Sequence, residues 1–392
     1  MQRARQKTFT GPAILSYGFR TFFLAASLYA GLSILLWLPQ FQGHLQLNTS
    51  FAPVDWHIHE MLFGFVAAVI SGFLFTAVPN WTGRMPIRGI PLLCLFVVWL
   101  AGRFAVTYSM SLGWVTAMII DCLFLAAIWG SIAIEIIAGK NWRNLKVLMP
   151  LTILFFSNVY FHVEAHEMGV SDVSQRVGLM AVIAFILLIG GRIVPSFTRN
   201  WLAKNNPGKL PKSFAFYEKA CLGICVISMV FWIILPDSLI TAVMLIGASV
   251  LLIGQLLRWV GYRTFKEPLV TVLHISYLFI PVGFFLLGAA IVWSDYILPI
   301  TGIHALGTGA VGGMILSVMV RATKGHTGQS LQSTRMDNLL FGVLFTSAVA
   351  RILSTFGFAG TMSLLHFSGL LWAIAFLGFA FVYGKCLGRK TV

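Results

Sequence analysis

The chain has 392 residues, of which 58% are hydrophobic and only 10% are charged, and its formal net charge at pH 7 is +15. Soluble domains carry roughly a quarter charged residues, so this composition excludes an ordinary soluble protein and indicates a polytopic membrane protein. The positive charge does not indicate nucleic-acid binding, because the basic residues lie in short groups between apolar runs, where they act as orientation signals.

Apolar runs recur along the whole chain, and each is near the length of about twenty residues that crosses a bilayer. We therefore predict an all-α fold, a membrane bundle of about twelve transmembrane helices. No loop is long enough for a soluble domain, so residues 1–392 are expected to form a single integral membrane domain with a cytoplasmic N-terminal tail, 1–17. The expected helices are 18–39, 56–78, 90–109, 112–138, 146–163, 176–197, 214–235, 238–259, 268–292, 297–320, 336–356 and 361–384.

Basic residues alternate with these spans. Lys and Arg are grouped before the first span, in the even-numbered loops and at the C-terminus, whereas the odd-numbered loops have almost none. The positive-inside rule then places both termini and all even-numbered loops in the cytoplasm. One missed helix would break this alternation, so the charge pattern supports the number of spans.

Similar segments recur at an interval of four helices. Gly72–Thr82 in the second span resembles Gly313–Thr323 in the tenth, and the sixth span has a related ending at 195–199. Three repeated four-helix units of about 120 residues would fit this pattern. Chance similarity among helices rich in Gly and Thr would fit it as well.

The second span begins with a group of titratable residues, His57, His59 and Glu60. Ionisable groups at the edge of hydrocarbon cost several kcal/mol unless they are paired or bound, so they indicate a functional site. Imidazole is also the commonest metal ligand in proteins. The stretch Trp56–Arg84 therefore leaves two interpretations open: a metal or haem site inside the bundle, or a hydrated interfacial role for the two histidines.

The predicted orientation sorts the histidines into two layers. Toward the outer side lie His44, His57, His59, His162, His166, His304 and His366, and toward the inner side lie His274 and His326. Residues two apart on a regular helix point about 200° away from each other, so His57 and His59 could share one metal only at a frayed or extended entry.

The fifth span ends with two histidines on one helical face. His162 lies deeper in the span and is the better candidate ligand, whereas His166, Glu164 and Glu167 are interpreted as part of a solvated acidic loop.

The tenth span carries a histidine among small residues. Glycines beside His304 could leave room for a flat macrocycle, or they could serve only for helix packing; they are Gly302, Gly307, Gly309, Gly312 and Gly313. His274 could be a second axial ligand or a hydrogen-bonded core residue, and His326 lies in a cytoplasmic turn. Arg103 and Arg351, inside helices, are expected to pair with carboxylates, carbonyl groups or haem propionates.

Four segments, in order along the chain, resemble the NnrS family. They are Gly18–Phe23, Trp56–Arg84 (WHIHEMLFGFVAAVISGFLFTAVPNWTGR), Arg192–Trp201 (RIVPSFTRNW) and Arg321–Gly328 (RATKGHTG). Members of that family are bacterial inner-membrane proteins that carry haem and copper and are associated with nitric oxide and denitrification. The resemblance implies that this chain is such a protein and that it lessens nitrosative stress. By motif position, the family's histidines are matched by His57, His59, His162, His274, His304 and His326.

These residues are the expected metal ligands. Haem b is expected on His304 and His274, with Arg103 and Arg351 near its propionates, and copper on His57, His59 and His162. Nitric oxide or a related small molecule is the expected ligand, the lipid bilayer is the other partner, and the electron donor is not identified.

Three functions remain open on the sequence. An oxidoreductase could convert nitric oxide at an iron and copper pair, a non-catalytic sensor or scaffold would bind haem without turnover, and a transporter of a metal or metal complex would lack stoichiometric haem. A proton pump is disfavoured, because Glu60 is the main intramembrane carboxylate recognised near the histidines.

Overall fold

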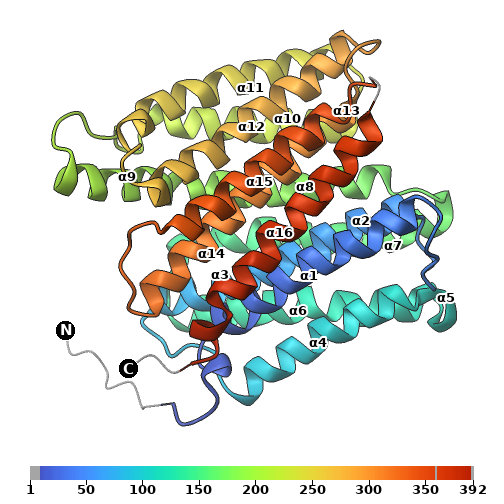
Figure 1. The fold of residues 1–392 in the computed structure, drawn as a ribbon, viewed down its shortest axis with the longest axis horizontal. Helices are drawn as coiled ribbons and strands as arrows, with labels where there is room; N and C mark the ends of the chain where they lie inside the picture. Colours follow the sequence, from blue (N-terminus) through green and yellow to red (C-terminus); the bar gives the residue numbers. More distant parts are fainter. Residues whose placement is uncertain (1–8, 358–359, 390–392) are drawn as a thin grey trace. The chain divides into compact units, whose positions relative to one another are not determined.

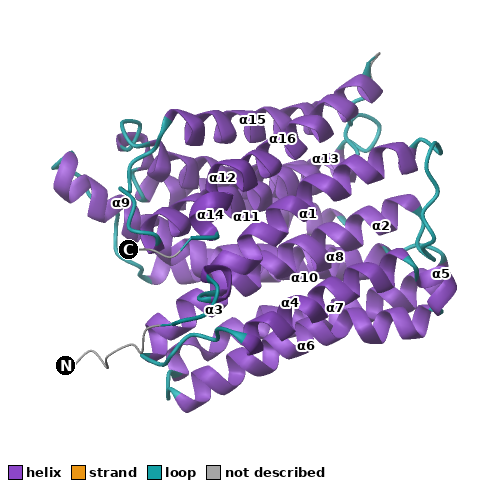
Figure 2. Ribbon diagram, turned by 60° about the horizontal axis from the view of Figure 1, so that its bottom comes forward, coloured by secondary structure: helices purple, strands orange, loops and turns teal. Residues whose placement is uncertain are grey.

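The computed structural model describes residues 9–357 and 360–389 (Figure 1). Every regular element in these residues is a helix (Figure 2). Twelve of the helical runs described there are long and apolar enough to cross a membrane. The predicted all-α, multi-pass membrane architecture is therefore confirmed.

Seven of the candidate spans consist of one regular helix. They are α1 (Gly18–Phe41), α4 (Ile90–Thr107), α6 (Trp114–Ala138), α10 (Phe216–Ile234), α12 (Pro268–Val292), α15 (Arg335–Leu353) and α16 (Thr361–Leu387). Two more join a 3-10 segment to a helix: η3 (Trp142–Val147) with α7 (Leu148–Met168), and α11 (Leu239–Arg258) with η5 (Gly261–Arg263).

The second, sixth and tenth spans are each interrupted by a π-helix. They consist of α2 (Pro53–His59), η2 (Glu60–Val66) and α3 (Ala67–Thr82), then α8 (Asp172–Phe185), η4 (Ile186–Gly190) and α9 (Gly191–Asn205), then α13 (Pro299–His304), η6 (Ala305–Gly312) and α14 (Gly313–His326). π segments are rare in proteins overall, and those that occur are often found at functional sites. Their positions follow the four-span interval of the predicted repeat.

The predicted spans agree with the structure in number and order, and the main differences lie at helix ends. The predicted range 176–197 becomes Asp172–Asn205, and 297–320 becomes Pro299–His326. A hydrophobic run marks only the part of a helix that lies in hydrocarbon, whereas the backbone hydrogen bonds continue into the polar flanks.

By their internal contacts, the helices form two compact units. Unit 1 comprises Met1–Gly178, Ala322–Gln329 and Phe379–Val392, and unit 2 comprises Leu179–Arg321 and Ser330–Gly378. The single domain expected over 1–392 stays a prediction.

In unit 1, α1 packs on α3, and α6 lies between α4 and α7 (Figure 1). Aromatic side chains fill the α1–α3 contact, where Phe22 and Phe75 have ring centroids 6.2 Å apart. Gly72 allows this approach, since a Cβ there would lie 2.8 Å from the ring of Phe23. Small residues at such contacts are typical of helix packing in lipid.

In unit 2, α12 packs against α11, α13 and η6. A Cβ on Gly302 would lie 2.8 Å from the backbone nitrogen of Leu287, so α13 and α12 approach at van der Waals distance. The hydroxyl groups of Thr301 and Thr355 are 2.7 Å apart and tie α13 to the residues that follow α15.

Candidate metal centre

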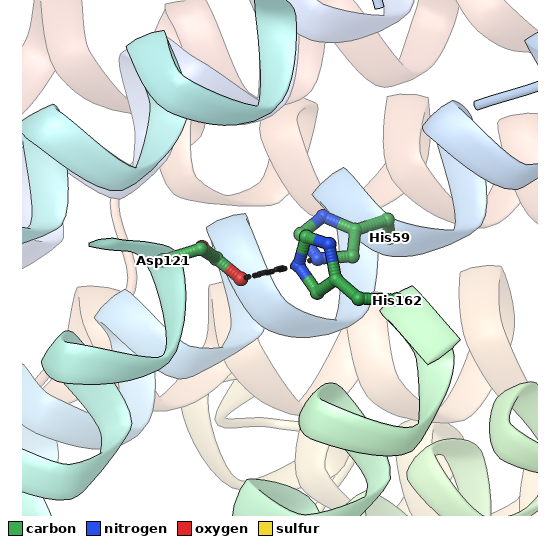
Figure 3. Close-up of side chains that lie close together, drawn as sticks. All are labelled: His59, Asp121 and His162. Carbon is green, nitrogen blue, oxygen red and sulfur yellow. Dashed lines mark hydrogen bonds and ion pairs between the residues drawn. The ribbon is translucent and has the colours of Figure 1, made fainter. Parts of the chain in front are cut away.

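Three buried side chains from three spans of unit 1 meet at one point. His59 at the end of α2, Asp121 in α6 and His162 in α7 face one another (Figure 3). The Oδ2 atom of Asp121 lies 3.2 Å from Nε2 of His59 and 3.3 Å from Nε2 of His162. None of the three residues is more than 2% exposed. We call this group the His59–Asp121–His162 centre.

The backbone changes from α to π at this centre. Gly64, in the π segment η2, accepts a hydrogen bond on its carbonyl oxygen from Nε1 of Trp99 at 3.0 Å. Its missing side chain leaves room for an ion pair, because a Cβ there would lie 2.6 Å from Nη1 of Arg103 and 2.8 Å from Oε2 of Glu60. The π segment and its glycine thus allow charged groups to pack beside the helix.

Arg103, in α4, connects the carboxylates around the centre. Its Nη1 donates to Oε2 of Glu60 at 2.5 Å, and its Nη2 donates to Oδ1 of Asp121. The hydroxyl of Tyr29 also donates to Oε2 of Glu60. All of these charged groups are buried, so each carboxylate depends on its hydrogen bonds for stability.

Both ring nitrogens of His59 have polar neighbours. Nδ1 lies 3.0 Å from Oε1 of Glu60, and Nε2 lies 3.0 Å from Oδ1 of Asn158. A carboxylate on Nδ1 orients the ring, as it does for many metal-bound histidines. Nε2 faces the oxygens of Asn158 and Asp121, an arrangement that a proton on Nε2 or a bound metal ion would satisfy.

The geometry of the centre fits a metal ion with nitrogen and oxygen ligands. One donor atom from each of the three residues lies within 4.8 Å of the others. Bonds of about 2.0–2.1 Å to a tetrahedral ion put ligand atoms about 3.4 Å apart. This is close to the 3.2 and 3.3 Å that separate Oδ2 of Asp121 from Nε2 of His59 and of His162. Imidazole and carboxylate donors suit copper, zinc and iron.

Of the histidines predicted to bind copper, the structure brings together two. His57 lies elsewhere, with its ring stacked on Trp37 at a centroid distance of 4.3 Å. The reason is the regular helix α2, on which residues two apart point in nearly opposite directions. His166 is exposed and stacks on Trp114.

The interpretation of Glu164 as a solvated loop residue is wrong. Glu164 is buried, and its carboxylate accepts hydrogen bonds from the backbone N–H groups of Val173 and Ser174, each at 2.8 Å. These groups belong to the first turn of α8, where N–H groups lack partners within the helix. Glu164 therefore caps the next span, whereas Glu167 is exposed as expected.

The two predicted haem histidines lie in unit 2 and have different surroundings. Nδ1 of His304 lies 2.9 Å from the carbonyl oxygen of Ile300, a contact that directs Nε2 away from its own helix. Nε2 of His274 instead lies 2.7 Å from the hydroxyl of Thr198, and a Cβ on Gly261 would lie 2.5 Å from the His274 ring. His274 is thus tightly packed and hydrogen-bonded.

Most glycines near His304 are accounted for by helix packing. A Cβ would meet a neighbouring side chain within 3.0 Å at Gly302, Gly309, Gly312 and Gly313. Beside Gly307, one turn from His304, a Cβ would meet nothing within 4 Å. The packing alternative is therefore favoured for four of the five glycines, and the space beside Gly307 is the one that a macrocycle edge could use.

The two arginines expected near haem propionates also differ. Arg103 pairs with carboxylates, which were among its predicted partners. Arg351 donates to the hydroxyl of Ser354 at 2.8 Å, and among the described residues it has no carboxylate partner. His326, at the end of α14, packs its ring 5.4 Å from that of Phe19.

Asp121, and the contact of Asn158 with it, were not predicted from the sequence. A signal for Asp121 was present, since it is a carboxylate in the middle of an apolar span, where an ionisable residue indicates function. Asn158 donates from Nδ2 to Oδ2 of Asp121 at 2.7 Å. Nothing in the sequence indicated that α6 and α7 bring these residues to the second span.

A family model described as NnrS protein matches residues 13–390. The chain belongs to the NnrS family. The family resemblance found in the four sequence segments is therefore confirmed, and it is consistent with a membrane protein whose role is related to nitric oxide. No curated protein matches this NnrS-family chain.

Proposed function

We propose that this NnrS-family protein holds copper and haem b in the bacterial inner membrane and lessens nitrosative stress by binding nitric oxide. The observation that carries the proposal is the buried His59–Asp121–His162 centre, which provides a set of metal ligands within the membrane spans. The charge pattern of the loops supports an orientation with both termini in the cytoplasm, which would put the centre toward the outer side.

Copper would be held by the Nε2 atoms of His59 and His162 and by Oδ2 of Asp121. When bound there, it supplies one-electron chemistry and a coordination position for a small ligand. Glu60 orients the His59 ring through Nδ1, and Arg103 occupies the other oxygen of Asp121, so that Oδ2 faces the two imidazoles.

Aromatic rings form an apolar wall around the two imidazoles. The ring centroid of Phe51 is 5.1 Å from that of His59 and 5.1 Å from that of His162. Phe63 and Phe161 lie 5.2 and 5.3 Å from the His59 ring. These rings exclude water and hydrated ions from the centre, whereas a small uncharged molecule such as nitric oxide dissolves readily in apolar surroundings.

Haem b would be held by His304. The contact between its Nδ1 and the carbonyl of Ile300 presents Nε2 as the ligand atom, and the open side of Gly307 lies on the following turn. His274 is a weaker candidate, because its ring is tightly packed: a Cβ on Gly261 would lie 2.5 Å from it, which leaves no room for a macrocycle there. Haem would supply a second coordination position for nitric oxide, on its iron, in addition to the position on copper.

The test is the visible spectrum and the metal content of the full chain purified in detergent. Iron and copper in stoichiometric amounts, with a Soret band that shifts when nitric oxide is added, would support the proposal. Loss of copper in His162→Ala but not in His166→Ala would assign the copper to the centre. Colourless, metal-free protein from cells well supplied with haem and copper would overturn the proposal.

A further inference from the structure

His366, near the start of α16, is a membrane-span histidine that the proposed metal sites leave unused. Two other histidines outside those sites have a packing role, since the ring of His57 stacks on Trp37 and that of His166 stacks on Trp114. Of the hydrogen bonds found among the described residues, only one involves the His366 ring, and it uses Nδ1. An imidazole within a membrane span is costly unless it is paired or bound, so a role for Nε2 is expected.

His366 has the same local geometry as His304, the proposed haem ligand. Nδ1 of His366 lies 2.7 Å from the carbonyl oxygen of Met362, and Nδ1 of His304 lies 2.9 Å from that of Ile300, in each case four residues earlier in the chain. A carbonyl oxygen can only accept, so Nδ1 carries the proton and Nε2 the lone pair in both neutral rings. Both residues are half-buried and belong to unit 2. Each ring therefore has Nε2 as its possible ligand atom.

The tenth and twelfth spans touch and cross the membrane in the same direction. A Cβ on Gly312, in η6, would lie 2.5 Å from the ring of Trp372 in α16, so these two residues are at one level. His304 comes eight residues before Gly312, and His366 comes six residues before Trp372. At about 1.5 Å per residue, this contact places the two histidines within about 3 Å of each other in depth.

A second set of contacts, through α15, gives a similar depth. The hydroxyl of Ser347 in α15 donates at 2.8 Å to the carbonyl oxygen of Ser368, two residues after His366 in α16. The threonine contact that ties α13 to the residues following α15 lies eight residues beyond Ser347 and three residues before His304. The same rise per residue gives a difference of about 4.5 Å, less than one helical turn. Two independent connections thus put the histidines at nearly the same level.

The side of the tenth span that carries His304 also has space. Gly302 packs against α12, and His304, two residues later, points to the opposite side of the helix. Gly307 follows His304 by about one turn, and a Cβ there would meet nothing within 4 Å. The side away from α12 therefore has room for the edge of a macrocycle.

We propose that His366 is the second axial ligand of the haem that His304 holds. This inference rests on the proposed function, because it assumes haem b at His304. Two axial imidazoles make haem b low-spin, whereas a single imidazole leaves it high-spin. Nitric oxide would compete with His366 for the same position, so His366 would determine how readily nitric oxide binds.

The experiment records the absorption and electron paramagnetic resonance spectra of the ferric full chain purified in detergent. The native protein is expected to be low-spin, and His366→Ala is expected to be high-spin with its haem retained by His304. Added imidazole should restore the low-spin spectrum of His366→Ala, a rescue that a purely structural role of His366 would not give. The apparent affinity for nitric oxide should rise by at least about tenfold in His366→Ala, because the competing ligand is gone.

Two further variants make the test specific. His166→Ala removes an exposed histidine that stacks on Trp114, and it should keep the native low-spin spectrum. His366→Met replaces one axial ligand by another, so the haem should stay low-spin while its reduction potential rises. If His366→Ala does not accumulate in the membrane, the potential of His366→Met decides the matter alone.

The outcomes distinguish this inference from the proposed function. A native protein with high-spin haem, or spectra and a potential unchanged by both substitutions of His366, would overturn the axial role and leave the proposed function standing. A native protein that contains no haem would overturn the haem part of the proposed function and this inference with it. Loss of the low-spin spectrum in His366→Ala and its return with imidazole would support the inference.

Discussion

The Nδ1 atom of His59 lies 3.0 Å from Oε1 of Glu60, its direct neighbour in the chain. Adjacent residues on a regular α-helix point about 100° apart. Here the helix changes from α to π between the two residues, with α2 ending at His59 and η2 beginning at Glu60. The orientation of a proposed metal ligand is therefore linked to the backbone geometry of the second span.

Gly64→Ala should destabilise unit 1. The new methyl group would meet Arg103 and Glu60 at distances that require one of them to move. Overpacking at such a site costs about 1–3 kcal/mol, so thermal unfolding in detergent should begin at a lower temperature. Gly130→Ala is the matched control, because a Cβ there meets nothing within 4 Å. Equal unfolding temperatures for the two variants would contradict the described packing.

Asp121→Asn should lose copper, whereas His57→Ala should keep it. The amide has nearly the shape of the carboxylate but lacks the charge, so the affinity for copper should fall by more than about tenfold. His57 stacks on Trp37 and is absent from the centre. Copper content measured after equal purification decides between the two residues, and loss of copper in His57→Ala alone would favour the ligands predicted from the sequence over those of the structure.

Glu164→Gln should destabilise the connection between α7 and α8. The glutamine keeps an acceptor oxygen but loses the charge that strengthens the hydrogen bonds to Val173 and Ser174. Loss of a helix cap costs about 1 kcal/mol, and an uncharged replacement should cost a similar amount or less. Glu167→Gln, at an exposed position, is the control. Chemical denaturation followed by tryptophan fluorescence would show whether only the first variant shifts its midpoint.

His304→Ala should lose haem, whereas His274→Ala should retain it. A Cβ on Gly307, one turn from His304, would meet nothing within 4 Å, whereas a Cβ on Gly261 would lie 2.5 Å from the His274 ring, so only the first site has space for a macrocycle edge. The Soret absorbance per protein, measured in membranes from haem-supplemented cells, compares the two variants directly. The opposite order of haem loss would place the iron on His274.

The sequence was sufficient to predict the spans, because each one is an apolar run flanked by basic groups. It also singled out His59 and His162 by their residue type and their depth. It could not show that Asp121 completes the set, since the contacts of α6 with α4 and α7 bring together residues that lie about forty positions apart. Glu164 was misread for a similar reason: the chain turns back after α7, and the N–H groups that Glu164 caps come from the next helix.

The π segments could not be foreseen, because their apolar and small residues are also common in α-helical membrane spans and do not specify the π hydrogen-bond pattern. Gly64 is an example, as its role depends on the positions of Arg103 and Glu60. Glycines are common in apolar spans, where most of them serve only the close packing of helices, so Gly64 did not stand out.

The π segment η2 makes the metal centre depend on the number of residues in the second span as well as on their identity. Each hydrogen bond of π type encloses one residue more than its α counterpart. Deleting a single residue from Glu60–Val66 would allow a continuous α-helix. The part of the span that carries His59 would then be rotated by about 100° relative to α3. All three ligands would still be present in the sequence, yet they would no longer face one another. A comparison of related chains should therefore treat a one-residue gap in this segment as equivalent to the loss of a ligand.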